Sequence, residues 1–269
     1  MKTLYVSDLD GTLLRHDETL SQFTIQTINK LVEKGLLFSY ATARSIVTAS
    51  RVTNGLSNQI PVILYNGAFI RRPGTNELLA SNFFGQEFTS LLEDLICHQV
   101  YPIVYSLDSD IEKYRYWVEM STQGMKVFNN SRTGDPRETP VHRAEDLYVD
   151  STFYMTCIDT TEKLLPLYEK YKEQFHCVLH HDIYSGNQWL EIMPKCTSKS
   201  NAVHQLKTIL QCDRVVAFGD GKNDIDMFQM ADECYAMENA VDELKEIATG
   251  IIGSNNDDGV AKWLLHNWD

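Results

Sequence analysis

YVSDLDGTLL, residues 5–14, places two acids, Asp8 and Asp10, at the end of an apolar run, with Gly11 and Thr12 directly after them. This pattern predicts a short buried strand that ends in a turn, and open α/β sheets bind ligands beyond the carboxyl ends of their strands. Residues two apart on an extended segment point the same way. We therefore expect both carboxylates in one small volume, where they repel each other unless a cation joins them.

A divalent metal with oxygen ligands is the natural cation for such a pair, and magnesium is the usual one beside a phosphate. The competing interpretation is purely structural, because most short acidic pairs are a helix cap and a turn acid, and Gly11-Thr12 fits such a turn. The pair alone therefore leaves both interpretations open.

A second acid-bearing segment, VVAFGDGKNDIDM, favours the metal. It places Asp220 and Asp224 just past another apolar run, and its Gly-Asp-Gly turn lets the backbone approach a ligand closely. The structural alternative is that Asp224 caps the following helix and Asn223 serves the turn. Two such strand ends in one α/β core predict a shared magnesium site formed by Asp8, Asp10, Asp220 and Asp224.

The composition is that of an ordinary folded protein, with 269 residues, 43% of them hydrophobic and 23% charged. The formal charge of −13 argues against a nucleic-acid or anionic-membrane partner, because both repel net negative charge. The six cysteines contain no CxxC pair, and no apolar run is long enough for a signal peptide or a membrane span. We expect a cytoplasmic protein with reduced thiols.

Apolar runs and helix-period segments alternate at both ends of the chain, which is typical of a parallel α/β sheet. The expected strands are residues 4–6, 36–40, 61–65, 214–218 and 234–237, and the expected helices are residues 21–33, 45–52, 200–210, 225–230, 241–248 and 260–268. The middle of the chain has another order: helices over 88–96 and 161–175, strands over 101–107 and 151–158, a long surface loop over 129–143 and a hairpin over 177–193. We expect an α/β, Rossmann-like parallel-sheet core of residues 1–82 and 190–269, with an inserted α+β domain of residues 83–189.

A phosphate ligand needs hydrogen-bond donors around its oxygens and a fixed cation. Thr42 ends the second expected strand and opens a helix, where backbone N–H groups favour an anion; the alternative is a simple helix cap. Lys199 stands at the start of another helix, where the helix dipole disfavours a cation. It is therefore either solvent-exposed or paired with an anion, and Lys195 is the competing candidate.

These motifs, in this order, resemble the four motifs of the haloacid dehalogenase (HAD) superfamily: DLDGTL at residues 8–13, Thr42, Lys199 and GDGKND at residues 219–224. The tail ECYAMENAVDELKEIATGIIGSNNDDGVAKWL is similar to that of the Cof-type phosphatases. The middle of the chain matches the large α+β (C2-type) cap of that subgroup in placement and size. The resemblance implies a phosphatase whose cap selects the substrate.

The resemblance also implies a role for each motif residue. Asp8 would be the nucleophile that forms an aspartyl-phosphate, and Asp10 would be the general acid and base. Magnesium (Mg²⁺) would be held by the Asp8 carboxylate, the Asp10 backbone carbonyl and Asp220, with Asp224 close by. The groups expected to bind phosphate oxygens are Thr42, the backbone amides of Leu9 and Ala43, Lys199 and Asn223.

Two positions depart from the family pattern. Ala43 stands where the second motif usually has glycine, and Glu238 stands where glycine usually precedes Asn-Ala in the tail. The expected partner is a small phosphorylated metabolite: a sugar phosphate, pyridoxal phosphate or flavin mononucleotide (FMN). We expect a monomer or weak homodimer. The rival interpretations are a phosphomutase of the same superfamily and a receiver-like phosphotransfer signalling protein.

Overall fold

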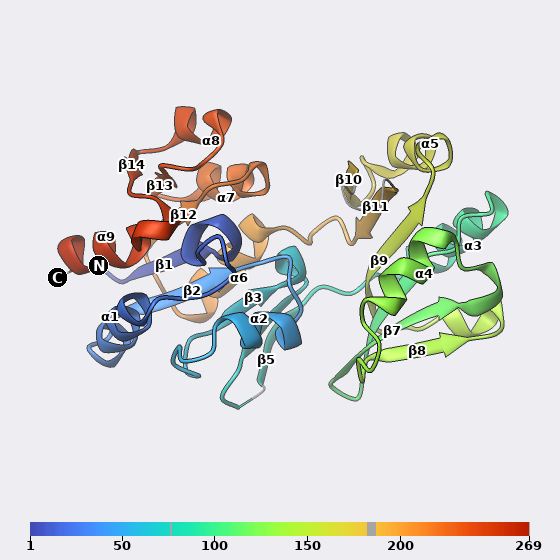
Figure 1. Cartoon of the computed structure of the whole chain (residues 1–269), viewed down its shortest axis with the longest axis horizontal. Helices are drawn as coiled ribbons and strands as arrows, with labels where there is room; N and C mark the ends of the chain where they lie inside the picture. The colour runs from blue at the N-terminus through green and yellow to red at the C-terminus, as the bar shows by residue number, and fades with distance from the viewer. Residues whose placement is uncertain (76, 182–186, 269) are drawn as a thin grey trace. The chain divides into compact units, whose positions relative to one another are not determined.

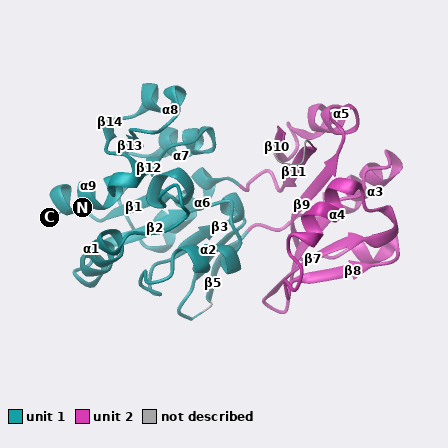
Figure 2. Cartoon of the chain, viewed as in Figure 1, with its two compact units in different colours: residues 1–81, 198–269 teal, residues 82–197 magenta. Residues whose placement is uncertain are grey.

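The computed structural model describes residues 1–75, 77–181 and 187–268. The chain divides into two compact units, which Figure 2 distinguishes by colour: unit 1 contains residues 1–81 and 198–269, and unit 2 contains residues 82–197. The second boundary lies later in the chain than the expected one at 189/190. The reason is that the strand Gln188–Met193 pairs within the sheet of unit 2.

Unit 1 is built on one eight-stranded sheet in the order β14-β13-β12-β1-β2-β3-β4-β5 (Figure 1). Its strands are β1 (Thr3–Asp8), β2 (Leu37–Ala41), β3 (Val62–Leu64), β4 (Phe69–Arg72), β5 (Glu77–Ser81), β12 (Arg214–Gly219), β13 (Glu233–Met237) and β14 (Gly250–Ile252). Pairing is parallel from β14 through to β3 and antiparallel for β3-β4-β5. The parallel, Rossmann-like core expected from the sequence is confirmed.

The register of the two central strands places the acid-bearing turns together. Ser7 of β1 lies opposite Phe218 of β12 in a parallel pair, so both strands end at the same edge of the sheet. Leu4, Val6 and Ala217 are completely buried, as expected for strands covered on both faces. The residues that follow β1 and β12 are therefore brought side by side by the pairing of their strands.

The described helices of unit 1 agree with the expected ones to within one residue at most ends. They are α1 (Gln22–Glu33), α2 (Ile46–Val52), α6 (Lys199–Ile209), α7 (Ile225–Met230), α8 (Asp242–Ile247) and α9 (Gly259–Asn267). Ser21, Ser45 and Ser198 each cap a helix by accepting a backbone N–H. Trp263 of α9 packs on Tyr235 with ring centroids 4.5 Å apart, which ties this helix to the sheet.

Unit 2 contains a six-stranded sheet in the order β10-β11-β9-β6-β7-β8. Its elements are α3 (Glu87–Cys97), β6 (Ile103–Asp108), β7 (Ile111–Trp117), α4 (Gln123–Asn130), β8 (Glu138–Val141), β9 (Thr152–Asp159), α5 (Thr161–Tyr171), β10 (His176–His181) and β11 (Gln188–Met193). The expected hairpin over residues 177–193 is present as the antiparallel pair β10 and β11, and residues 182–186 lie outside the described part.

One expectation for unit 2 is wrong: residues 129–143 are not a continuous surface loop, because they include the end of α4 and the strand β8. β8 reads Glu-Thr-Pro-Val, and proline argued against a strand. The structure places β8 at the edge of the sheet, paired only with β7, and an edge strand tolerates a residue without a backbone donor.

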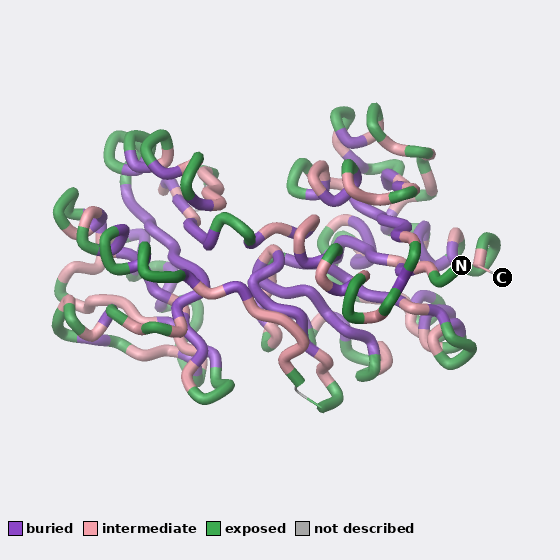
Figure 3. The backbone as a smooth tube through the Cα atoms, turned by 180° about the vertical axis from the view of Figure 1, so that it is seen from behind, coloured by how far each residue is buried: buried purple, intermediate pink, exposed green. Residues whose placement is uncertain are grey.

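The buried residues lie mainly in the strands of the two sheets. Figure 3 shows that the buried segments run mainly through the strands, whereas exposed segments lie on helices and connections. Unit 2 has its own apolar core, in which Leu92, Met155 and Leu190 are completely buried. Among the described residues, every helix is too short or too polar to span a bilayer.

Candidate functional site

β1 ends at Asp8, and the chain then turns sharply. Residues Leu9–Leu13 form a single wide helical turn that is closed by a 2.8 Å hydrogen bond from the Leu14 N–H to the Leu9 carbonyl. Within it Gly11 has a φ of 81°, in the left-handed region that favours glycine. The strand ends at Asp8, so the two-residue period that would point both carboxylates the same way does not continue to Asp10. Asp8 is 4% exposed, whereas the Asp10 side chain is 48% exposed, and the expectation that the two carboxylates share one small volume stays a prediction.

Asp8 instead belongs to a buried cluster that we define as Asp8, Asp220, Asp224 and Lys199. The Lys199 ammonium lies 2.5 Å from Asp8 Oδ1 and 2.7 Å from Asp224 Oδ1. Asp8, Asp224 and Lys199 are 4%, 0% and 2% exposed. Of the two alternatives left open for Lys199, solvent exposure or an anionic partner, the structure shows the second: two carboxylates offset its unfavourable helix position.

The carboxylate of Asp224 is held on both oxygens. Oδ1 accepts from Lys199, and Oδ2 accepts from the backbone N–H groups of Asp220 at 3.1 Å and Gly221 at 3.0 Å. Gly219 makes room for this contact, since a Cβ there would lie 2.8 Å from the Asp224 side chain. Asp224 therefore orients both Lys199 and the turn that carries Asp220.

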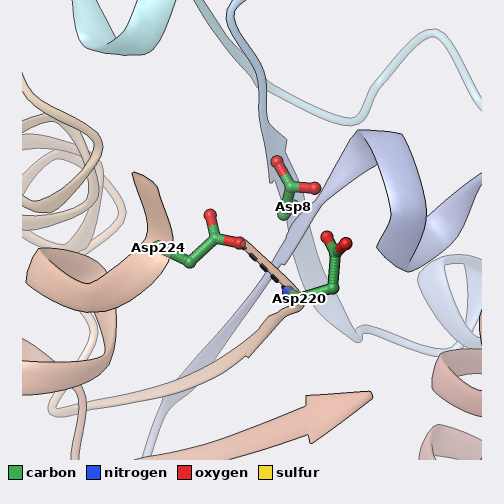
Figure 4. Close-up of side chains that lie close together, drawn as sticks. All are labelled: Asp8, Asp220 and Asp224. Atoms are coloured by element: carbon green, nitrogen blue, oxygen red, sulfur yellow. Dashed lines mark hydrogen bonds between the residues drawn. The ribbon is translucent and has the colours of Figure 1, made fainter. Parts of the chain in front are cut away.

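Asp220 follows β12 and faces Asp8 across the strand ends. Its Oδ1 accepts the Thr12 hydroxyl at 2.8 Å. A Cβ on Gly11 would lie 2.3 Å from Asp220 Oδ2, so only glycine allows this close approach. Ligand oxygens of Asp8, Asp220 and Asp224 all lie within 4.8 Å of one another, and Figure 4 shows the three side chains converging. Such a set of carboxylate oxygens suits a hard divalent cation.

The electrostatics of the buried cluster also favour a cation. Burial, reinforced by the charge of Asp224, raises the pKa of Asp8 well above the usual value, and burial raises the pKa of Asp220. Burial by itself would lower the pKa of Lys199, but the charges of Asp8 and Asp224 outweigh it and raise that pKa. With all four groups ionised the cluster carries three negative charges and one positive charge, and a divalent cation balances the difference of two.

Lys199 owes its place to the start of α6. Ser198 caps this helix, and its Oγ accepts the Asn201 N–H at 3.0 Å. The Ser198 carbonyl packs against Gly67, whose φ is 104° and whose Cβ would lie only 2.2 Å from that oxygen. The competing candidate, Lys195, is exposed in unit 2, with Nζ 3.5 Å from the Lys172 carbonyl.

Asp10 belongs to a second set that we call the rim cluster: Asp10, Arg44 and Glu18. Arg44 holds Asp10 through two nitrogens, with Nε 2.9 Å from Oδ2 and a terminal nitrogen 2.5 Å from Oδ1. The same guanidinium lies 3.1 Å from Glu18 Oε2. The hydrogen bond to Asp10 is the main cause that raises the pKa of Arg44. Arg44 was not among the predicted site residues, although it contacts Asp10, which was, and follows Thr42 and Ala43 in the sequence.

The other predicted phosphate-binding residues differ in how far they are exposed to solvent. Thr42 is buried; its N–H donates to the Ile63 carbonyl, and its Oγ1 accepts the Arg44 N–H at 3.1 Å. The expectation that Thr42 opens a helix is wrong, because α2 begins only at Ile46. Its cap is Ser45, whose Oγ accepts the Thr48 N–H. Leu9 is buried, whereas Ala43 and Asn223 are exposed.

Open α/β sheets bind ligands beyond the carboxyl ends of their strands, and in this α/β protein that edge of the sheet carries three carboxylates and a buried lysine. A sequence model of the haloacid dehalogenase-like hydrolases matches residues 5–264. The chain therefore belongs to this family, as the resemblance of its motifs indicated.

The relatives agree with this assignment. The 5-amino-6-(5-phospho-D-ribitylamino)uracil phosphatases YitU and YwtE of Bacillus subtilis are 27% and 28% identical to the chain. The alignments cover 97% and 96% of this chain and 96% and 95% of those proteins. The expected enzyme class, a phosphatase of the HAD superfamily, is confirmed.

Solved structures share the fold over the whole chain. The TM0651 protein of Thermotoga maritima has a TM-score of 0.80 at 26% identity, covering 100% of this chain and 98% of its own. A protein from Eubacterium rectale has a TM-score of 0.81 at 20% identity, covering 99% and 98%. The second likeness concerns the fold alone.

Proposed function

We propose that this protein is a magnesium-dependent phosphomonoester hydrolase that acts on a small phosphorylated metabolite through an aspartyl-phosphate intermediate. The observation that carries the proposal is the buried cluster, in which Asp8 lies at a strand end against Lys199 and beside two further carboxylates. A buried aspartate whose charge is balanced by fixed cations suits a nucleophile, because attack on phosphorus requires the ionised form.

Asp8, Asp220 and the backbone carbonyl of Asp10 would hold Mg²⁺, with Asp224 close by. The donor set fits, since magnesium prefers oxygen ligands and usually keeps several waters. Both oxygens of Asp224 already accept hydrogen bonds, so we assign it to orienting Lys199 and the Asp220 turn. When bound, the cation supplies positive charge beside the transferred phosphoryl group.

Asp8 would attack phosphorus with a carboxylate oxygen, forming a new P–O bond while the bond to the leaving oxygen breaks. Asp10 would give its proton to that leaving oxygen and then take a proton from the water that hydrolyses the aspartyl-phosphate. Lys199, which touches Asp8, would offset charge on the phosphoryl oxygens. Asp10 is 48% exposed, so its carboxylate is accessible to a bound ester.

The remaining phosphate contacts would come from short segments around the same strand ends. The Thr42 side chain, the backbone N–H groups of Leu9 and Ala43, and Asn223 would donate to the phosphate oxygens. Fixed donors of this kind stabilise the charge of the transition state without reorganisation. Ala43 keeps a backbone N–H, so the departure from glycine leaves this donor in place.

Unit 2 would be the cap that selects the substrate. Two relatives act on a uracil that carries a phosphorylated ribityl chain, which supports a phosphate ester of a small organic molecule as substrate. Sugar phosphates, pyridoxal phosphate and FMN are the classes to test. We propose no nucleic-acid or membrane partner, and a monomer or weak homodimer located in the cytoplasm.

The decisive experiment is phosphate release from a panel of these esters, with MgCl₂ or with a chelator. The wild type is compared with Asp8→Asn, and Asp110→Asn serves as a control at an exposed turn of unit 2. We expect magnesium-dependent turnover that falls by about six orders of magnitude in Asp8→Asn, the scale seen when a nucleophile is removed. Turnover that persists in Asp8→Asn, or that is indifferent to magnesium, would contradict the proposal.

A further inference from the structure

We propose that Asn239 is a positioning residue that ties together the two acid-bearing turns of the site. The inference rests on the proposed function, because it concerns the ligands assigned to magnesium. Asn239 is exposed and lies in the connection between β13 and α8, far along the chain from the turn that follows β1. It is the asparagine of the Asn-Ala pair in the tail, where Glu238 precedes it.

The first contact is with the turn that follows β1. Asn239 Nδ2 donates to the Gly11 carbonyl at 2.8 Å, and Asn239 Oδ1 accepts the Asn255 N–H at 3.1 Å. The Asn239 side-chain amide therefore donates its NH₂ group to the turn, while its oxygen accepts from the C-terminal segment. Gly11 is the residue with positive φ that sets the course of this turn.

The second contact is with the turn that follows β12. The Val241 N–H, two residues after Asn239, donates to the Asp220 carbonyl at 2.9 Å. The short segment 239–241 therefore bonds to both acid-bearing turns at once. The Thr12 hydroxyl also donates to Asp220, and this hydrogen bond links the two turns directly.

A second asparagine supports the same turn from the other side. Asn255, which is 2% exposed, donates from Nδ2 to the Leu14 carbonyl at 2.8 Å. Leu14 also closes the turn through its N–H to Leu9. The carbonyls of Gly11 and Leu14 thus accept from the side-chain amides of Asn239 and Asn255, and the backbone N–H of Asn255 donates to Asn239 Oδ1.

The consequence concerns the spacing of the proposed metal ligands. Magnesium demands near-ideal octahedral geometry, so small changes in the separation of Asp8, Asp10 and Asp220 weaken its binding. Partners that orient metal ligands from outside affect metal affinity or activity by about 10- to 100-fold. Without the Asn239 amide the Gly11 carbonyl loses this donor, and the bond from the Thr12 hydroxyl to Asp220 is left to hold the spacing of the two turns.

Asn256 provides a matched control, because it also reaches the N-terminal segment with its amide. Its Oδ1 accepts the His16 N–H at 3.1 Å, beyond the turn and away from the acids. Both asparagines are exposed, so neither Asn239→Ala nor Asn256→Ala leaves a buried group unpaired on its own side chain. Thermal unfolding of both variants verifies that they fold like the wild type.

The test combines magnesium binding by calorimetry with hydrolysis of p-nitrophenyl phosphate. We expect Asn239→Ala to weaken magnesium binding and lower kcat, each by about 10-fold or more, with KM for the ester little changed. Asn256→Ala should stay within about twofold of the wild type in every quantity, as ordinary surface substitutions do.

Each outcome bears on the inference separately from the proposed function. If the wild type binds magnesium but releases no phosphate, the hydrolase proposal fails, and weaker magnesium binding in Asn239→Ala alone still supports the positioning role. Equal magnesium affinity in the two variants overturns the role of Asn239, whatever the turnover. A wild type that binds no magnesium also overturns the role of Asn239.

Discussion

Asp8 and Asp10 are two positions apart, yet the structure places their side chains in opposite environments. Asp8 lies in the buried cluster, where Lys199 is its cationic partner and two more carboxylates are close. Asp10 lies in the rim cluster, about half exposed, with Arg44 as partner. Each acid has one basic partner from a distant part of the chain, but only the pair in the buried cluster is shielded from water.

This difference shows that the contribution of an ion pair to the free energy of unfolding depends on its burial. Breaking a buried pair by removing one partner costs about 3–5 kcal/mol, because an uncompensated charge stays in a medium of low polarity. An exposed pair contributes about 0–1 kcal/mol, since water and salt screen it. The buried cluster should therefore govern stability and metal binding, whereas the rim cluster should govern only the orientation of Asp10.

The largest effect is expected for Lys199→Met. The substitution leaves Asp8 and Asp224 buried without their shared cation, so the free energy of unfolding near pH 7 should fall by about 3–5 kcal/mol. Chemical denaturation measures the loss. Lys195→Met, four residues earlier and exposed, is the control and should change stability by less than about 0.5 kcal/mol. Equal losses in the two variants would mean that the buried pair carries no special weight.

A smaller effect is expected from magnesium, and its sign follows from the pKa shifts. Burial raises the pKa of Asp8 and Asp220, so the metal-free folded protein keeps their protons to higher pH than the unfolded chain does. The contribution of these two groups to the stability of the folded protein therefore falls as pH rises above 3.8, the ordinary aspartate pKa. Magnesium binds the ionised carboxylates and offsets this loss, by about 2.7 kcal/mol at 100 times its Kd.

The measurement is the rise in melting temperature that MgCl₂ produces relative to a chelator, at several values between about pH 4.5 and about pH 7.5. We expect the rise to grow with pH, because protons compete with the cation at the lower end. Asp220→Asn, which removes one ligand, should flatten this dependence. A magnesium effect that is the same at every pH, or unchanged in Asp220→Asn, would argue against the buried cluster as the binding site.

The smallest effects on stability are expected in the rim cluster. Arg44→Ala should lower the free energy of unfolding by at most about 1 kcal/mol, and Glu18→Gln by less. Arg44→Ala frees the Asp10 carboxylate, so we expect kcat for p-nitrophenyl phosphate to fall by about 10-fold or more while Glu18→Gln stays near the wild type. Arg44→Lys should restore only part of the rate, because lysine cannot reproduce the two-nitrogen contact.

Steady-state kinetics and denaturation of the three variants provide both readouts. A loss of several kcal/mol in Arg44→Ala would place the rim cluster in the same energetic class as the buried one and would remove the contrast between them.

Much of the fold followed from local patterns. The apolar run before Asp8 and the helical spacing after Ser21 each act over a few residues, so the sequence alone revealed them. The strand β8 was missed because its proline is tolerated only at a sheet edge, and edge position is a property of the whole sheet. The roles assigned to Asp8, Asp10 and the phosphate-binding residues remain predictions.

The sequence by itself determined the parallel α/β core, the haloacid dehalogenase-like motifs and the candidate acids, because short-range periodicity and motif order are written along the chain. Only the tertiary structure decided which carboxylates meet. It buried Asp8 and left Asp10 about half exposed, paired Lys199 with Asp8 and Asp224, and brought Asn239 to the Gly11 carbonyl. Those contacts join residues far apart in the chain, so their geometry depends on strand register and turn closure that no local pattern encodes.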